Sequence, residues 1–569
     1  MIKTPPSYQQ PIKEESRRLI WKGAIDRLTG DRAESRIISE QYVRNLWEYS
    51  LEKVLRPYTS VKDLNSGVLE EWCAFATSEY GTKSPSDLRV AYLSGPEPEN
   101  DMSILLSLGV QIPNVWAFEQ EATIYTEALR KAHDLHPSLK LYPGRIEEFI
   151  ESANIKFDVI YLDFTGPLFS PSTKPFRVLH RILESHGISS LGVLILNSAE
   201  PEQTQGTVEL LTDYFRNQAF VEGTVYGERN KSGEDIYWHV EGPDSYGYGE
   251  SQLRKLVEDN FSSAYSAFAT QYPAMYATYV QPAFTVLTNR VAKKRFFNPE
   301  QQVIERVLNR FSSPDALLAN LRGSQGSAGQ DGLSSAFSTG VKDRAEAPEV
   351  AFGSDFILSP YDYPLQHFLV RLKLRTENSY ARSLLAPFEE MIGGVSRQGA
   401  LRSFDVLRSV LEGYWELLSP ELRDALRSVY AALPDRKGGL FCDVPMIHLW
   451  AEAALYQLGF PYHVNVRRHW RGTYKAKAHQ MHLDSFVLDQ CRAFYDWMPM
   501  IELYGRDLAS TERQLISRIC MDAICKCRDH LVPRLYAGAN LICFGTESWA
   551  REAEICRRLD LSADLDPNK

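Results

Sequence analysis

The sequence predicts an α/β fold, with a mostly parallel sheet preceded by helices and followed by a mostly helical C-terminal part. Two patterns between residues 85 and 245 support this. Five short apolar runs alternate with amphipathic helical patterns, as in strands joined by helical crossovers, and these runs are residues 88–93, 114–118, 139–142, 157–163 and 192–197. Two further runs, 220–226 and 236–240, are separated by a loop too short for a helix, so we expect them to pair antiparallel and to close the sheet.

The length and charge of the chain limit the kinds of protein it can be. A chain of 569 residues is too long for one hydrophobic core, so we expect several domains. Its net charge of −10 excludes a protein that binds polyanions over its whole surface. The eight cysteines are few for this length, and no apolar run approaches the roughly 18 residues of a membrane span. We therefore expect a cytoplasmic protein with reduced thiols and no membrane contact.

Composition shifts along the chain predict five regions. Residues 1–84 form an N-terminal helical segment, 85–245 form the sheet domain, and 246–322 form a helical extension. Residues 323–350 are rich in Gly, Ser and Ala and lack hydrophobic periodicity, which is typical of a flexible linker. Residues 351–569 follow as a mostly helical C-terminal domain. The linker is the clearest domain boundary that the sequence offers.

Two residues follow the first two predicted strands and indicate a binding site. Gly95 lies in the turn after the first strand, and Glu119 ends the second. Parallel strands bring their carboxyl ends to one edge of the sheet, where α/β proteins bind nucleotide-bearing ligands. A glycine lets the backbone approach such a ligand, and a carboxylate can accept hydrogen bonds from both ribose hydroxyls. The alternative for Glu119 is a carboxylate that caps the helix following it.

This arrangement of strands, glycine turn and acid resembles the class I S-adenosylmethionine-dependent methyltransferase superfamily over residues 85–245. The resemblance implies a Rossmann-like sheet of methyltransferase type, with S-adenosylmethionine as the cofactor. It also implies that Glu119 holds the cofactor ribose, that Arg145 and Ile146 flank the adenine, and that Asp163 faces the methyl group and the substrate as the catalytic residue.

The first turn departs from the pattern of this superfamily. It contains the single glycine Gly95, and Leu93 stands where the superfamily has an acid. Glu97 or Glu99 is our candidate for the replacement carboxylate that binds the cofactor amino group. The departure leaves two functions open. One is a methyltransferase that acts on a large substrate, such as RNA or DNA, and the other is an inactive methyltransferase-like protein that binds a nucleotide or serves as a scaffold.

A basic segment in the C-terminal part is the candidate nucleic-acid interface. It combines positive charges with aromatic side chains and contains no acid, and its members are Arg467, Arg468, Trp470, Arg471, Tyr474, Lys475 and Lys477. Basic groups that follow phosphates, together with aromatic rings that stack on bases, are typical of single-strand binding. The alternative is a basic loop that pairs with acidic groups of its own chain.

The cysteines Cys520, Cys525 and Cys527 do not predict a metal site. They lie within one helical pattern and have no second ligand pair nearby, whereas structural zinc sites usually combine two separated pairs. We expect buried thiols there and no bound metal.

Overall fold

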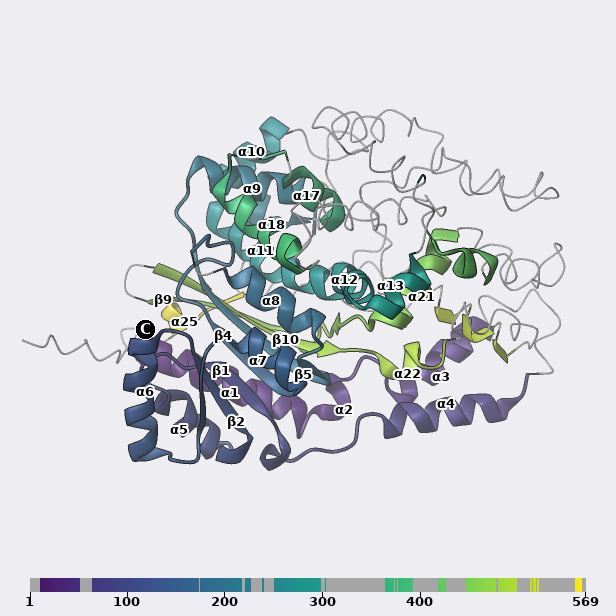
Figure 1. Ribbon diagram of the computed structural model, residues 1–569, viewed down its shortest axis with the longest axis horizontal. Helices are drawn as coiled ribbons and strands as arrows, with labels where there is room; N and C mark the ends of the chain where they lie inside the picture. Colours follow the sequence, from purple (N-terminus) through teal and green to yellow (C-terminus); the bar gives the residue numbers. More distant parts are fainter. Residues whose placement is uncertain are drawn as a thin grey trace, which may run out of the picture.

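The computed structural model shows a large mixed sheet between two layers of helices (Figure 1). The structure describes residues 11–51, 64–172, 174–216, 221–226, 238–239, 250–297, 302, 364–372, 374–375, 377–391, 418–425, 447–476, 479–498, 512–513, 515–517, 519–520 and 558–564. Among the helices in these ranges, none has the length and apolar character needed to span a lipid bilayer.

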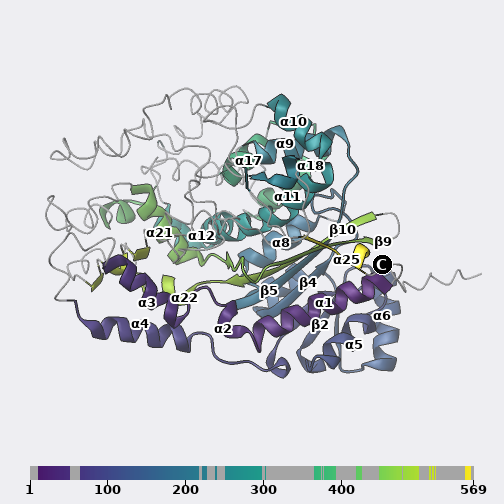
Figure 2. The same ribbon diagram turned by 180° about the vertical axis from the view of Figure 1, so that it is seen from behind.

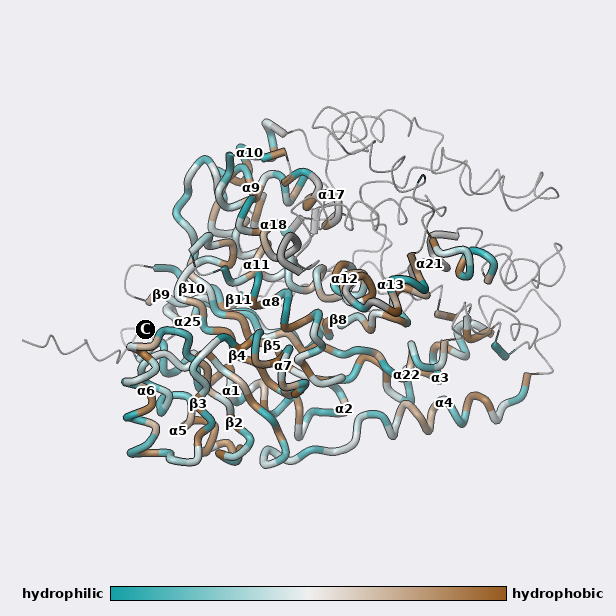
Figure 3. The backbone as a smooth tube through the Cα atoms, in the orientation of Figure 1, coloured by the Kyte–Doolittle hydropathy of each residue, from teal (hydrophilic) through white to brown (hydrophobic). Residues whose placement is uncertain are grey.

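Five parallel strands form the centre of the sheet, as the sequence predicts. They are β1 (Val90–Leu93), β2 (Val115–Glu119), β3 (Lys140–Pro143), β4 (Phe157–Asp163) and β5 (Ile188–Ala199). Their spatial order is β3-β2-β1-β4-β5, which is a Rossmann-like order. The direction in which successive strands are added changes between the parallel neighbours β1 and β4. Strand β4 is buried along most of its length, and the central strands carry much of the apolar sequence of the sheet (Figure 3).

An antiparallel hairpin extends the sheet beyond β5, but it comes from a different part of the chain than predicted. Strand β10 (His479–Asp489) pairs antiparallel with β5, and β9 (Trp470–Ala476) pairs antiparallel with β10. The short strand β11 (Arg558–Asp560) runs parallel to β9 and forms the edge, while β8 (His463–Val464) pairs with the end of β10. The sheet therefore takes strands from both sides of residues 323–350 and is not confined to the predicted region 85–245.

The hairpin predicted from residues 220–226 and 236–240 does not join the main sheet, so the prediction that it closes this sheet is wrong. Strands β6 (Val221–Glu222) and β7 (Trp238–His239) do pair antiparallel, but they form their own two-stranded sheet. Strand β10 pairs with β5 over residues Met481–Asp489, whereas β6 is two residues long. The longer ladder satisfies far more backbone groups along the buried edge of β5, and this explains which hairpin lies there.

The helices that cover one face of the sheet are α1 (Pro11–Leu28), α5 (Glu99–Ser107) and α6 (Ala122–Leu135), with α1 lying obliquely across the strands (Figure 2). The opposite face is covered by α7 (Ile146–Ala153), α8 (Pro175–Glu184), α11 (Phe261–Met275) and α12 (Gln281–Thr288). The two faces bury two hydrophobic clusters, one on each side of the strands.

The remaining helices lie outside these two layers. Near α8 and α11 are α9 (Gln205–Phe215), α10 (Glu250–Asp259), α17 (Pro364–Leu372) and α18 (Ser379–Met391). Helix α21 (Ile447–Gly459) packs against α12, followed along that side by α13 (Arg290–Phe296). At the end of the molecule remote from α6 lie α3 (Glu40–Tyr49), α4 (Ser66–Ser78) and α22 (Arg492–Tyr495). Two short helices are α2 (Arg32–Ser35), next to α1, and α25 (Leu561–Asp564), next to β9.

Candidate functional site at the carboxyl edge of the sheet

The turn after β1 and the ends of β2 and β3 lie directly beside one another, as the sequence predicts. The Ser94 N–H donates to the Phe118 carbonyl oxygen at 3.0 Å, and the Gly144 N–H donates to the Glu119 carbonyl oxygen at the same distance. The two bonds continue the strand pairing past the ends of β1 and β3. Gly95 and Glu119, which adjoin the first of these bonds, therefore lie at one edge of the sheet.

Gly95 has the backbone conformation and the open surroundings that a ligand-binding turn requires. Its φ is +58°, in the left-handed region that other residues rarely adopt. A Cβ built on Gly95 would have no heavy atom within 4 Å, so space is open beside this backbone. The buried Tyr92 hydroxyl donates to the Pro98 carbonyl oxygen at 2.9 Å and holds the far side of the turn.

The Glu119 carboxylate is partly engaged by its own chain. Its Oε1 accepts the Glu121 N–H at 2.8 Å, just before α6 begins. Partial burial raises the pKa of Glu119, while the backbone N–H groups of Glu121 and Gln120 act in the opposite direction. The carboxylate thus organises the entry to α6, as in the capping alternative, and it remains at the strand end where a ribose would bind.

The Glu97 carboxylate already has partners within the protein. Its Oε1 lies 3.2 Å from Lys131 Nζ of α6, and its Oε2 accepts a hydrogen bond from Asn100 Nδ2 at 3.1 Å. The predicted binding of a cofactor amino group by Glu97 would have to displace or share the Lys131 ammonium.

Arg145 and Ile146, the two predicted adenine neighbours, differ in exposure. Arg145 precedes the first residue of α7, is 39% exposed, and lies 3.9 Å from Glu147. The Ile146 side chain is 1% exposed and packs in the hydrophobic core below the sheet edge. A ligand at this edge would therefore contact the backbone of Ile146 and not its side chain.

Asp163 ends β4 and lies in a compact polar group beneath α1. Its Oδ1 accepts a hydrogen bond from Asn197 Nδ2 of β5 at 2.7 Å, and its Oδ2 lies 3.1 Å from Lys13 Nζ of α1. Asn197 Nδ2 also donates to the Tyr474 hydroxyl of β9 at 2.7 Å. Since side chains alternate along a strand, Asp163 shares the face of Tyr161, which packs against α1.

Helix α1 makes a contribution to this edge that the sequence interpretation did not include. Arg17 Nε lies 3.1 Å from Asp101 Oδ1 in the first turn of α5, and the same oxygen accepts the Trp21 indole N–H at 2.8 Å. Lys13 and Arg17 are spaced one helical turn apart, so both face the carboxylates of the sheet edge. The i, i+4 spacing of Lys13 and Arg17 indicates that they share one helical face, but nothing in the sequence identifies the carboxylates that they contact.

Two of the seven residues of the predicted nucleic-acid segment, Arg471 and Tyr474, are buried in the sheet. Arg471 is 1% exposed on β9 and lies 3.1 Å from Glu222 of β6, so it joins the two-stranded sheet to the main one. Tyr474 is also 1% exposed. In this conformation neither side chain is exposed for contact with phosphates or bases.

The other members of the segment are placed differently. Arg468 Nη1 lies 3.3 Å from Asp31 Oδ2, which is the pairing within the chain that the alternative predicted. The Trp470 ring packs along its own strand over Gly472 and is partly buried. Arg467 and Lys475 are exposed, and Lys477 lies outside the described residues.

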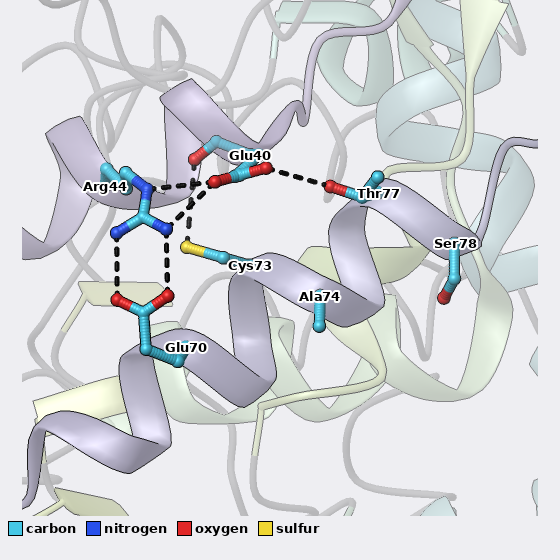
Figure 4. Close-up of a pocket in the computed structure, with 7 residues that line it drawn as sticks. All are labelled: Glu40, Arg44, Glu70, Cys73, Ala74, Thr77 and Ser78. Atoms are coloured by element: carbon cyan, nitrogen blue, oxygen red, sulfur yellow. Dashed lines mark hydrogen bonds and ion pairs between the residues drawn. The ribbon is translucent and has the colours of Figure 1, made fainter.

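A surface groove lies between α3 and α4, away from all the predicted site residues (Figure 4). Its lining consists of Glu40, Arg44, Glu70, Cys73, Ala74, Thr77 and Ser78. The Arg44 guanidinium bonds both Glu40 and Glu70 across it, so each carboxylate already has a cationic partner. Within the described parts of the chain, no group of three or more His, Cys, Asp or Glu side chains is placed to hold a metal ion. Cys520 is buried, and Cys525 and Cys527 lie outside the described residues.

Comparison with known proteins adds no family assignment. The sequence matches no protein-family model, and no curated protein matches it.

Proposed function

We propose that this chain is an S-adenosylmethionine-dependent methyltransferase with its site at the carboxyl edge of β1, β2 and β4. The observation that carries the proposal is the strand order β3-β2-β1-β4-β5 followed by the antiparallel β10 and β9, combined with the open glycine turn beside Glu119. Such an edge suits a nucleoside-bearing ligand, because the crevice lies where the strand order reverses.

The residues at this edge fit parts of the cofactor. The backbone at Gly95 can approach the ligand closely, and Glu119 has the position of a ribose acceptor. Bound there, S-adenosylmethionine supplies an electrophilic methyl group on a sulfonium. Asp163 is the protein group that we assign to the acceptor side, where its carboxylate orients the nucleophile and stabilises positive charge that develops on it. Asn197 fixes one oxygen of that carboxylate at 2.7 Å.

The acceptor is, in this proposal, a large substrate such as RNA or DNA. Among the described residues of the segment, Arg467 and Lys475 are exposed basic residues that could contact phosphates. The buried Arg471 and Tyr474 have structural roles and are not part of the proposed contact.

A second function has specific support, namely a nucleotide-binding or scaffold protein without catalysis. The Lys131–Glu97 and Glu121–Glu119 contacts occupy two carboxylates that a methyltransferase would use for its cofactor. If these contacts persist in solution, the cofactor is bound weakly or not at all.

Isothermal titration of the full-length chain with S-adenosylmethionine and S-adenosylhomocysteine separates these functions. The methyltransferase proposal predicts that both ligands bind at one site and that NAD⁺ does not. Heat of binding followed by transfer of a labelled methyl group to RNA, DNA or protein supports the enzyme, and binding without transfer supports the second function. Absence of binding to protein that is folded by circular dichroism contradicts the proposal.

A further inference from the structure

The first turn of α1 covers the polar group at the end of β4. Lys13 Nζ lies 3.1 Å from Asp163 Oδ2, and Asp163 Oδ1 accepts the hydrogen bond from Asn197, so both oxygens of this carboxylate are engaged. Ser16 of the same turn is 2% exposed, and its hydroxyl lies beside that of Tyr474. The Asp163 side chain is 15% exposed. While Lys13 holds Oδ2, a methyl acceptor cannot take its place on the carboxylate that the proposed function assigns to it.

The contacts of α1 do not satisfy every group beneath it. Asn197 is fully buried, and its Oδ1 has no hydrogen-bond partner among the described residues. The amide orientation follows from its neighbours, because Nδ2 donates to both Asp163 Oδ1 and the Tyr474 hydroxyl. Lys13 contacts Asp163 and does not supply the missing donor. Buried polar groups with a purely structural role are normally all paired, so this incomplete group favours a binding site that α1 closes.

The covering turn is also the part of α1 that opens at the lowest cost. The N–H groups in the first turn of a helix have no carbonyl partner within that helix, and helix ends open more readily than the middle. One turn later Arg17 Nε lies 3.1 Å from Asp101 Oδ1, and the Trp21 indole N–H donates to the same oxygen, so the helix is fastened from there onward. The Lys13 side chain is 27% exposed and can therefore exchange Asp163 for water.

We propose that the first turn of α1, residues 11–16, is an autoinhibitory cover, in which the Lys13 ammonium occupies the Asp163 carboxylate until a ligand displaces it. This inference rests on the proposed function, because the ligand that needs this space is S-adenosylmethionine together with its acceptor at the end of β4. Binding must then break the Lys13–Asp163 ion pair, and the observed affinity is reduced by the free energy of opening the cover. Arg17 stays paired with Asp101 and is the point about which the turn opens.

The first experiment removes the Lys13 ammonium from the full chain and measures affinity by isothermal titration. A partly exposed ion pair contributes up to about 1 kcal/mol, so Lys13→Met is expected to bind S-adenosylmethionine and S-adenosylhomocysteine about fivefold more tightly than the wild type. Lys22→Met is the matched control with unchanged affinity, because Lys22 pairs with Asp26 within the same helix. Adenosine, which lacks the part of the ligand that extends to Asp163, is expected to bind both proteins equally. Unchanged or weaker binding of the two full ligands by Lys13→Met overturns the inference.

The second experiment uses the wild-type chain and needs neither a variant nor methyl transfer. Trace acylation with acetic anhydride measures the reactivity of each lysine with and without S-adenosylhomocysteine. The inference predicts that the ligand raises acylation of Lys13 several-fold, because opening of the cover separates this amine from Asp163. Acylation of Lys22, which is 63% exposed, is expected to stay the same. Acylation of Lys13 that falls or stays constant in saturating ligand overturns the inference.

Failure of this inference can be distinguished from failure of the proposed function. If the wild type and Lys13→Met are both folded and neither binds S-adenosylmethionine, the proposed function fails and the inference fails with it. If the wild type binds the ligand while Lys13→Met gains no affinity, the inference fails and the proposed function stands. Binding that is detected only in Lys13→Met supports both.

Discussion

Arg17 of α1 and Asp101 of α5 form a buried ion pair, with Nε and Oδ1 3.1 Å apart. The Trp21 indole N–H donates to the same carboxylate oxygen, so two side chains of α1 converge on one acid. Burial raises the pKa of Asp101, and the adjacent Arg17 charge acts against that rise. This arrangement fastens α1 over the sheet and thereby places Lys13, one turn earlier, beside Asp163.

Replacing Arg17 by Met is expected to lower the free energy of unfolding by about 3–5 kcal/mol. The variant leaves the Asp101 carboxylate buried without its cation, and an uncompensated buried charge is more costly than the removal of a surface ion pair. Urea unfolding measures the difference. The control is Arg18→Ala, since the Arg18–Glu14 pair is exposed and is expected to contribute below about 1 kcal/mol. Equal effects of the two substitutions would contradict a role for Arg17 in fastening α1.

Gly95→Ala tests the turn after β1. The space beside Gly95 is open, but its φ of +58° disfavours an L side chain by about 1–2 kcal/mol. We expect that loss of stability in urea unfolding, together with weaker binding of S-adenosylmethionine, because a Cβ would enter the space that the ligand needs. Gly81→Ala is the matched control, because Gly81 also has open space and lacks the positive φ. Unchanged affinity in the Gly95 variant would remove this turn from the proposed site.

Glu119→Gln is expected to weaken S-adenosylmethionine binding about tenfold or more. A charged acceptor contributes about 1.5–3 kcal/mol to a hydrogen bond, and the amide keeps the size of the side chain while losing that charge. Titration calorimetry gives the affinity, and Glu148→Gln is the control because this glutamate is exposed on the neighbouring α7. If Glu119 only caps the entry to α6, its substitution will change stability and leave ligand affinity unaltered.

The stability of the protein is expected to fall as the pH drops from about 6.5 to about 4. His469 is buried beside Asp484, with Nε2 3.0 Å from Oδ1. Burial lowers the pKa of His469 to about 4, although the hydrogen bond to Asp484 acts in the opposite direction. The unfolded histidine has an ordinary pKa of about 6.5, so in this interval the unfolded chain binds a proton that the folded chain does not. The contribution is fully present above pH 6.5, and about 3 kcal/mol is lost by pH 4.

Urea unfolding at several pH values checks this expectation. His186 has a pKa that burial likewise lowers to about 4, so it adds to the same loss. His469→Gln is expected to reduce the slope of unfolding free energy against pH in this interval, whatever its effect at neutral pH. A slope that stays the same in this variant would show that His469 is not the group that titrates.

The regular βα alternation allowed the central strands and the adjacency of Gly95 and Glu119 to be predicted from the sequence. Strands β9 and β10 could not, because buried polar residues interrupt their apolar pattern. His482 and Asp484 are buried on β10, which gives that segment the appearance of a surface element. Their partners are distant in sequence, as in the pairing of Asp484 with Arg558, so no local pattern reveals them.

The same limit applies to the basic segment. The sequence shows that Arg467 and Arg471 are both positive, and only the fold separates them, since Arg471 pairs with Glu222 some 250 residues earlier in the chain. The Lys13–Asp163 contact was hidden for the same reason. Charge composition predicts that partners exist, whereas the identity of each partner depends on which elements the sheet brings together.

The exposed remainder of the basic segment leads to a specific prediction about nucleic acid. Replacing both Arg467 and Lys475 by Ala should weaken binding of single-stranded RNA and reduce the slope of log affinity against log salt by about 0.7 for each phosphate that is no longer neutralised. The Lys475 side chain is exposed, so its replacement should change the unfolding free energy by no more than about 0.5 kcal/mol. Arg471→Met should instead lower the unfolding free energy, because the loss of Arg471 leaves Glu222 buried without a cation. Fluorescence anisotropy at several salt concentrations distinguishes the two, and an unchanged slope in the double variant would mean that RNA does not bind at this segment.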